Sequence, residues 1–274
     1  MIAQYPPGPG ARGRPRTAAW LGVVVACCAT AACGLGDREL RPGDYRGVIT
    51  TPEGELPFGL HVARDETGLA LHLVNGGERV RVSQVEVAEG QLTARFEPDA
   101  ATVTAKIRGD RLSGRVTLPG AGGGQVEYPF AAHAGQKWRF FEEPVNDNAD
   151  VSGRWDVTLT ADGAPVRRAD ARLQQSFEQV TATIGTTDSP GGLLAGEVRH
   201  DDVYLSRYDG ITAELCHARL QDDGGLAGWC WSAARGRESF EARRNAGATP
   251  DEIAADPAPA SVPQATVPSP APTP

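Results

Sequence analysis

The sequence predicts an all-β protein made of two related antiparallel β units. Three observations lead to this prediction: apolar and polar residues alternate over short runs, turn residues separate the runs about every ten residues, and one pattern of strands and turns occurs twice. Alternation places one face of a strand against a core and the other in water, as in antiparallel sheets. Such short, evenly spaced strands indicate a sandwich or a barrel, and the sequence leaves that choice open.

The repeat is clearest at two pairs of landmarks. Arg95-Phe96 matches Arg207-Tyr208, 112 residues later, and Leu112-Ser113-Gly114 matches Leu226-Ala227-Gly228, 114 residues later. The difference of two residues falls in a turn, where changes of length disturb little packing. The common order of the landmarks favours a duplication over two unrelated meanders that share turns.

The first β unit is expected over residues 44–141, and its most specific turn is Asn75-Gly76-Gly77. Asn and Gly both accept positive φ, so this stretch predicts a tight hairpin. Gly120 to Gly124 is interpreted as a loop, because no helix follows it as a phosphate cradle would require. Trp138 to Phe141 is expected to end the unit.

Residues 142–150 are expected to form a solvated linker between the units. Asn146, Asn148 and Asp150 weakly match an oxygen-ligand calcium loop, but the terminal Glu of a true loop is missing.

The second β unit is expected over residues 151–245. Leu173 and Phe177 have helical spacing, yet the strand pattern continues from Phe177 to Ile184, so this stretch is predicted as strand. Residues 246–274 are rich in Ala and Pro and offer almost no apolar bulk for a core. They are predicted to be a disordered tail.

Residues 1–32 have the features of a lipoprotein signal peptide. A basic segment precedes a short apolar run that ends in Ala31-Ala32-Cys33, which resembles a bacterial lipobox and implies lipidation of Cys33. Thr30 stands where the lipobox usually has Leu, and Val24 to Cys27 is a competing match. Gly34 after the cysteine implies transfer to the outer membrane, where residues 33–43 would be the tether.

Composition limits the partners that the exported chain can have. The formal net charge is −8 for the whole chain and near −11 once Arg12, Arg14 and Arg16 leave with the signal. An acidic chain with interspersed charges argues against nucleic acid and against a polybasic membrane patch. The expected partners are therefore the membrane, through the lipid anchor, and an envelope protein.

Only Cys216 and Cys230 lie in the predicted folded region, and we expect them to form a disulfide. The turn between them is centred on Asp223, and opposed residues in a hairpin have numbers that sum to twice the centre. The numbers 216 and 230 sum to 446, so the cysteines face each other in a symmetric turn. Opposed Cα atoms lie within disulfide range, and an exported protein meets an oxidising compartment.

The sequence contains no recognisable catalytic, metal or cofactor motif. The five histidines lack metal-ligand spacing, no second cysteine completes a CxxC motif at Cys230, and the common hydrolase and nucleotide motifs are missing. Glu197, Asp201, Asp202 and Asp209 could meet in space, but so could any carboxylates of a small β domain. We therefore predict no catalytic residues, no metal and no cofactor.

Several motifs of the second unit resemble one known family. Leu205 to Gly210, then Gly225 to Trp229, then Trp231-Ser232 resemble the β-rich module that precedes the thioredoxin domain in some periplasmic TlpA-type thiol–disulfide oxidoreductases. Gly54 to Phe58 is similar to the first half of that module. The thioredoxin domain and its CxxC are missing here, so the resemblance implies an envelope β module and carries over no oxidoreductase activity.

The favoured function is non-catalytic binding or scaffolding at the cell envelope. One alternative is a carrier with a small apolar ligand inside a calycin-like barrel, and another is an accessory module for a separate thioredoxin-like oxidoreductase. A hydrolase with an unrecognised site is also kept. A roomy apolar cavity would favour the carrier, a filled core with an exposed aromatic patch would favour protein binding, and a cleft with convergent titratable groups would favour the enzyme.

Overall fold

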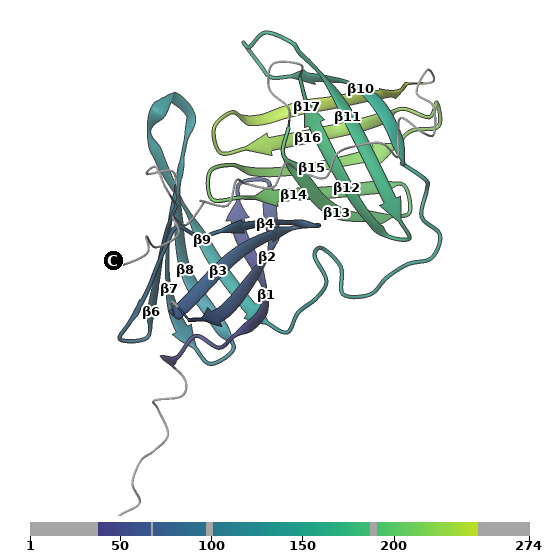
Figure 1. The fold of residues 1–274 in the computed structure, drawn as a ribbon. Helices are drawn as coiled ribbons and strands as arrows, with labels where there is room; N and C mark the ends of the chain where they lie inside the picture. Colours follow the sequence, from purple (N-terminus) through teal and green to yellow (C-terminus); the bar gives the residue numbers. More distant parts are fainter. Residues whose placement is uncertain (1–37, 67, 97–100, 187–190, 246–274) are drawn as a thin grey trace, which may run out of the picture. The chain divides into compact units, whose positions relative to one another are not determined.

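The computed structural model describes residues 38–66, 68–96, 101–186 and 191–245. These residues form two antiparallel sheets within one compact unit of the chain, which confirms the all-β prediction (Figure 1). The lipidation candidate Cys33, the signal peptide and the predicted tail 246–274 lie outside the described residues. In the part of the chain that is described, no helix is long and apolar enough to span a membrane.

The first sheet is open and has the order β4-β3-β2-β1-β9-β8-β7-β6-β5. Its strands are β1 (Gly43–Thr51), β2 (Gly54–Asp65), β3 (Gly68–Asn75), β4 (Glu78–Arg81), β5 (Gln84–Ala88), β6 (Gln91–Phe96), β7 (Ala101–Arg108), β8 (Arg111–Pro119) and β9 (Gln125–Ala134). The predicted glycine-rich loop joins β8 to β9 and contains one turn of 3-10 helix, Ala121–Gly123.

The second sheet is a closed barrel in which the first and last strands also pair. Its strands are β10 (Gly153–Thr160), β11 (Arg167–Ser176), β12 (Gln179–Gly185), β13 (Leu193–Arg199), β14 (Asp202–Tyr208), β15 (Ala213–Leu220), β16 (Leu226–Ser232) and β17 (Gly236–Arg244). The second unit is therefore a closed barrel, with the strand order of a calycin-like meander, and not a sandwich.

The two sheets follow the same path with one difference, which supports the duplication. In the barrel, β13 pairs with β12 on one side and with β14 on the other. In the first sheet the corresponding strand is divided: β4 pairs only with β3, and β5 pairs only with β6. The division falls at Val82–Ser83, and it leaves the first sheet open where the second is closed.

The matched glycines of the repeat have the same physical role in both sheets. A Cβ atom on Gly114 would lie 1.9 Å from the carbonyl oxygen of Thr104, and one on Gly228 would lie 2.0 Å from that of His217. Both are far inside the contact distance of real side chains, so the neighbouring strand approaches too closely for any residue but glycine. The Leu-x-Gly motif therefore marks a close approach of two strands.

Each sheet has its own apolar core, but the first core includes residues of the barrel. Inward side chains fill the barrel, among them Trp155, Leu173, Leu194 and Phe240. Four barrel residues that point outward belong instead to the core of the open sheet: Tyr208, Ala213, Leu215 and Trp231. The outside of β14, β15 and β16 thus completes the core that the open sheet cannot close by itself.

The hairpin predicted at Asn75-Gly76-Gly77 is confirmed between β3 and β4: Asn75 ends β3 opposite Glu78, and Gly76 has the positive φ, 57°. One local prediction is wrong for an identifiable reason. Phe177 does not continue a strand, because Phe177 and Glu178 form the turn between β11 and β12, where Phe177 has a φ of 56° and is 88% exposed. The helix-like spacing of Leu173 and Phe177 therefore reflects a hairpin tip, and strand is correct on both sides of it.

Candidate functional site

The predicted disulfide is present, and both cysteines lie on the inner face of the barrel. Cys216 on β15 pairs directly with Cys230 on β16, with their Cα atoms 4.1 Å apart. The register is the one that the symmetric turn at Asp223 predicts. Cys216 and Cys230 both border the barrel core.

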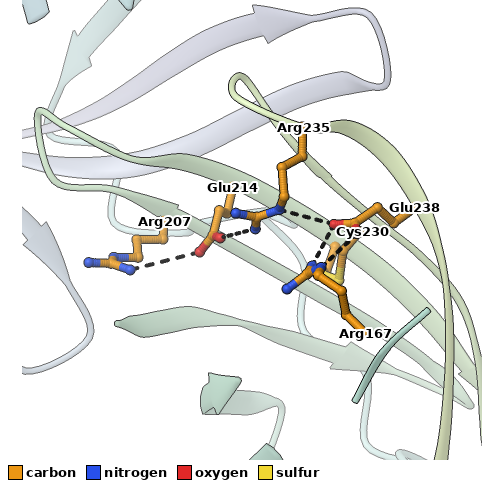
Figure 2. The surroundings of a disulfide bond; sticks show 7 residues. Arg167, Arg207, Glu214, Cys230, Arg235 and Glu238 are labelled. Carbon is orange, nitrogen blue, oxygen red and sulfur yellow. Dashed lines mark hydrogen bonds and ion pairs between the residues drawn. A yellow bond between two sulfur atoms is a disulfide. The ribbon is translucent and has the colours of Figure 1, made fainter. Parts of the chain in front are cut away.

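Beside the disulfide, a chain of ion pairs lies at one end of the barrel (Figure 2). Glu238, the neighbour of Cys230 on β17, accepts two hydrogen bonds from the guanidinium of Arg167, at 3.0 and 2.7 Å, and one from Arg235. Arg235 also pairs with Glu214, which lies 3.8 Å from Arg207. Each carboxylate thus meets at least two guanidinium groups.

Arg207 reaches this cluster because a glycine lies beside it. A Cβ atom on Gly192 would lie 1.7 Å from the guanidinium carbon of Arg207. Arg207 also forms a close ion pair with Asp209, so its charge is compensated from two sides. The charges of the cluster therefore compensate one another, although the buried Nε of Arg207 has no hydrogen-bond partner in the described structure.

Glu238 should make stability depend on pH. Burial raises the pKa of its carboxyl, but the hydrogen bonds and charges of Arg167 and Arg235 outweigh burial and hold the pKa below the ordinary 4.5. A carboxyl with a lowered folded-state pKa stabilises the fold above its unfolded pKa, and loses that contribution as pH falls through the folded value.

We therefore expect Glu238→Gln to lower the free energy of unfolding by about 2 kcal/mol at pH 7, as for a hydrogen bond to a charged group. The difference from the parent protein should shrink below pH 4.5, which urea titrations at pH 7, 5 and 3 would measure. A difference that stays constant from pH 7 to pH 3 would contradict this account. Glu241→Gln, on the exposed outer side of β17, is the matched control.

Removing the disulfide should have a moderate effect on stability. Cys216 and Cys230 are separated by 14 positions, and a loop of this length corresponds to about 3 kcal/mol of loop-closure entropy. The double variant Cys216→Ser/Cys230→Ser is expected to lose about 2 to 3 kcal/mol in urea unfolding. Two thiols that can be alkylated without prior reduction, detected by mass spectrometry of the native protein, would show that the bridge is not formed.

At the opposite end of the barrel, the side chain of Trp155 fills the interior, and we call it the aromatic plug. Trp155 is 1% exposed, its indole N–H donates to the carbonyl of Val151, and the guanidinium of Arg244 covers its ring at 4.5 Å from the centroid. The plug at one end, the ion pairs at the other and the apolar side chains between them fill the barrel. This favours a packed core over a ligand cavity.

A buried polar network joins the barrel to the open sheet, and it begins in the segment that was expected to end the first unit. The guanidinium of Arg139 donates to the hydroxyl and the carbonyl of Ser206, both at 2.9 Å, and to the side-chain oxygen of Asn75 at 3.1 Å. Glu197 accepts the backbone N–H groups of Arg139, Phe140 and Phe141, at 2.8 to 3.3 Å. Trp138 to Phe141 thus follow β9, the last strand of the first sheet, and this segment lies between the two sheets.

Other contacts make the same junction specific. Asn75 donates to the carbonyl of Tyr208, and Ser206 donates to the carbonyl of Pro57 at 2.6 Å. Burial lowers the pKa of Arg139 to about 9, opposed by the charge of Glu197, so the guanidinium stays charged at neutral pH. The network fixes which faces of the two sheets meet.

A row of aromatic side chains crosses the outside of the barrel beside this junction. Tyr204, His217 and Trp229 are direct neighbours on β14, β15 and β16, and the rings of Tyr204 and His217 stack with centroids 4.6 Å apart. Phe141 continues the row against Tyr204 at 5.0 Å. We call these four residues, all half-exposed, the aromatic row.

Charged groups border the aromatic row on three sides. Guanidinium groups cover both ends, Arg199 over Phe141 and Arg237 over Trp229. The imidazole of His217 lies 2.9 Å from Asp202, which also accepts from Arg219. An apolar strip with a charged rim is the usual composition of a protein-binding surface.

Of the carboxylates that could have met, only Asp201 and Asp202 share a partner. Glu197 lies in the buried network, Asp201 and Asp202 pair with Arg219, and Asp209 pairs with Arg207. No group of three metal-binding side chains occurs among the described residues.

The predicted linker 142–150 is mostly exposed, and some of its polar side chains bind backbone groups. Asn148 donates to the carbonyl of Val145 and accepts from the backbone of His200, while Asp150 accepts from Ser152. The oxygen of Asn148 thus binds the turn between β13 and β14, and that of Asp150 binds the connection between β9 and β10, which runs beyond the predicted residues 142–150.

Sequence reasoning missed two features that depend on pairing between strands. His61 and His72 are opposed on β2 and β3, with ring centroids 6.2 Å apart, although eleven positions separate them. The aromatic row is also invisible as a motif, because its members come from four separate segments. A register for β14 to β16 would have revealed it.

The fold and these sites together define a class: a two-unit antiparallel β protein with a packed calycin-like barrel. No family model and no curated protein matches the sequence. Among solved structures, a candidate outer membrane protein from Bacteroides fragilis is similar over 74% of this chain and 97% of its own, with 9% identity and a TM-score of 0.25. A protein of unknown function of the DUF3598 family from Nostoc punctiforme is similar over 75% and 96%, with 12% identity and a TM-score of 0.26.

Proposed function

We propose that this protein is a lipid-anchored protein of the bacterial cell envelope that acts by binding a protein partner, without catalysis. The observation that carries the proposal is the half-exposed aromatic row on the outside of a barrel whose interior is filled. A filled interior disfavours the carrier of a small apolar ligand, and the charged clusters are satisfied by one another. What remains available for recognition is the outer surface.

Site-specific photo-crosslinking in intact cells tests this proposal. A photoreactive residue at Trp229 should give one discrete adduct, while the same residue at Arg168, on the exposed outer side of β11, should give none. Tyr204→Ser should reduce the adduct from position 229. Equal adducts from both positions, or a small apolar molecule extracted in stoichiometric amounts from the purified protein, would contradict the proposal.

The lipid anchor is a separate part of the proposal. It is supported by the small residues before Cys33 and the short tether after it. Metabolic labelling with a palmitate analogue should mark the protein and should be lost in Cys33→Ala. Labelling that survives this substitution would place the anchor at Cys27 or Cys28. Membrane fractionation tests separately whether the protein is transferred to the outer membrane.

The resemblance to the TlpA-type module points to one class of partner, a separate thioredoxin-like oxidoreductase. The Cys216–Cys230 disulfide gives such an enzyme a bond to attack: the enzyme thiolate forms a mixed disulfide with one cysteine, and the other leaves as a thiolate. A variant enzyme without its resolving cysteine should then accumulate a mixed disulfide with this chain. Trapping that is unchanged in Cys216→Ser/Cys230→Ser would exclude this relation.

A further inference from the structure

The described chain begins at one end of the open sheet, where its first residues are firmly attached. The side chain of Arg38 lies against the turn between β5 and β6, at 3.0 Å from the position of a Cβ atom on Gly90. Leu40 is 4% exposed and belongs to the core of the sheet, and the hydroxyl of Tyr45 donates to the carbonyl of Arg41. The point at which the tether meets the fold is therefore defined.

This end of the sheet lies opposite the turns that contact the barrel. The strands β1, β6 and β8 begin here, beside the end of β9. The contacts with the barrel involve the other ends of the strands, for example Glu53 with Arg237 and the ring of Phe96 against Gly210. The attachment point of the tether and the barrel thus lie at opposite ends of the strands.

A basic hollow of about 730 Å³ surrounds the attachment point. Its charged members are Arg38, Lys106, Arg108 and Glu89, all exposed, so three cations face one carboxylate. Within the described residues none of these three cations has an ion pair, in contrast to the arginines at the barrel end. The hollow is a local excess of positive charge on a chain whose net charge is −8.

The tether is short enough to hold this hollow at a membrane. Five peptide steps separate Cys33 from Arg38, and an extended chain spans at most about 3.6 Å per residue, or about 18 Å in total. A lipid on Cys33 would therefore keep the basic hollow within about two Debye lengths of the lipid headgroups at physiological ionic strength.

We propose that the basic hollow binds the headgroup phosphates of the bilayer that holds the anchor, so that this end of the open sheet faces the membrane. The inference rests on the proposed anchor at Cys33. Arginine and lysine are the side chains that recognise phosphate, and each cation near an anionic membrane surface contributes about a fivefold change in partitioning. The barrel, with its aromatic row, is then presented away from the bilayer.

Quenching by lipids that carry a nitroxide group tests this orientation. The lipidated protein is labelled either at Glu86→Cys, on β5 near the hollow, or at Asp222→Cys, in the turn between β15 and β16. In phosphatidylcholine vesicles containing phosphatidylglycerol, the label at position 86 should be quenched several times more strongly than the label at position 222. Equal quenching at the two positions in lipidated protein would overturn the proposal while leaving the anchor intact.

A matched pair of variants tests the charge requirement. Lys106→Glu/Arg108→Glu should abolish the difference between the two labels, whereas Arg154→Glu/Arg168→Glu, an equal change of charge on the barrel, should preserve it. The difference should weaken at high salt and survive 10 mM inorganic phosphate. If phosphate at constant ionic strength abolished it, the hollow would be a site for the free ion and the membrane proposal would fail.

The mass of the amino-terminal peptide in the same sample separates the two proposals. If no lipid is attached, the anchor proposal fails, and co-sedimentation with the same vesicles at low salt becomes the measurement. Binding that drops about tenfold or more in Lys106→Glu/Arg108→Glu would then support the hollow. Binding unaffected by this double variant would overturn it.

Discussion

Replacing Glu197 by alanine should lower the free energy of unfolding by about 3 to 5 kcal/mol, because it removes a buried carboxylate that accepts three backbone hydrogen bonds and offsets the charge of Arg139. Glu197 is 8% exposed and accepts three backbone N–H groups of the segment wedged between the sheets. The substitution leaves these donors unsatisfied, and it leaves the guanidinium of Arg139 without its opposite charge. Urea denaturation followed by tryptophan fluorescence would measure the loss.

Two further variants make the prediction specific to the network. Glu197→Gln keeps an acceptor oxygen and the side-chain volume, so it should lower the free energy of unfolding by less than Glu197→Ala does. Glu241→Ala removes a carboxylate from the exposed outer side of β17 and should change stability by less than about 0.5 kcal/mol. If Glu197→Ala were as mild as Glu241→Ala, the contacts between the sheets would contribute little to stability.

Replacing Trp155 by alanine should cost about 3 to 5 kcal/mol, the usual range when a large aromatic side chain is deleted from a core. The ring is 1% exposed, donates to Val151 and lies under Arg244, so its removal opens the plugged end of the barrel. Since Tyr208, Leu215 and Trp231 of the barrel complete the core of the open sheet, both sheets should lose stability together. Calorimetry should therefore show one transition that moves to lower temperature.

The control for this prediction is the most exposed large apolar residue in the described chain. Phe177→Gly removes an 88% exposed ring at a φ of 56°, a conformation that glycine adopts without strain. We expect its stability to be unchanged or slightly higher, in contrast to Trp155→Ala. Two separate transitions in Trp155→Ala, with that of the open sheet unmoved, would show that the open sheet is stable without the barrel.

The local features of this protein can be predicted from its sequence, because they depend on neighbours along the chain. Alternation indicates which residues of a strand face a core, and the length of a turn sets the register of a hairpin. That Cys216 lies opposite Cys230 follows from their residue numbers alone, since one short turn joins their strands. The repeated Leu-x-Gly motif is visible in the sequence for the same reason, although its cause, a close approach of backbones, is visible only in the structure.

The tertiary structure alone decided how the strands close and which surfaces meet. Whether the meander closes depends on one strand. In the barrel, β13 pairs with a neighbour on each side, whereas in the open sheet β4 pairs only with β3 and β5 only with β6. Asn75 resembles a turn residue in the sequence, but it serves the junction because Tyr208, 133 positions later, presents its backbone there. The aromatic row and the basic hollow likewise combine separate segments, so no local pattern contains them. By itself the sequence determined the strands, the hairpins and the disulfide, whereas contacts between distant segments decided the barrel, the junction and the binding surfaces.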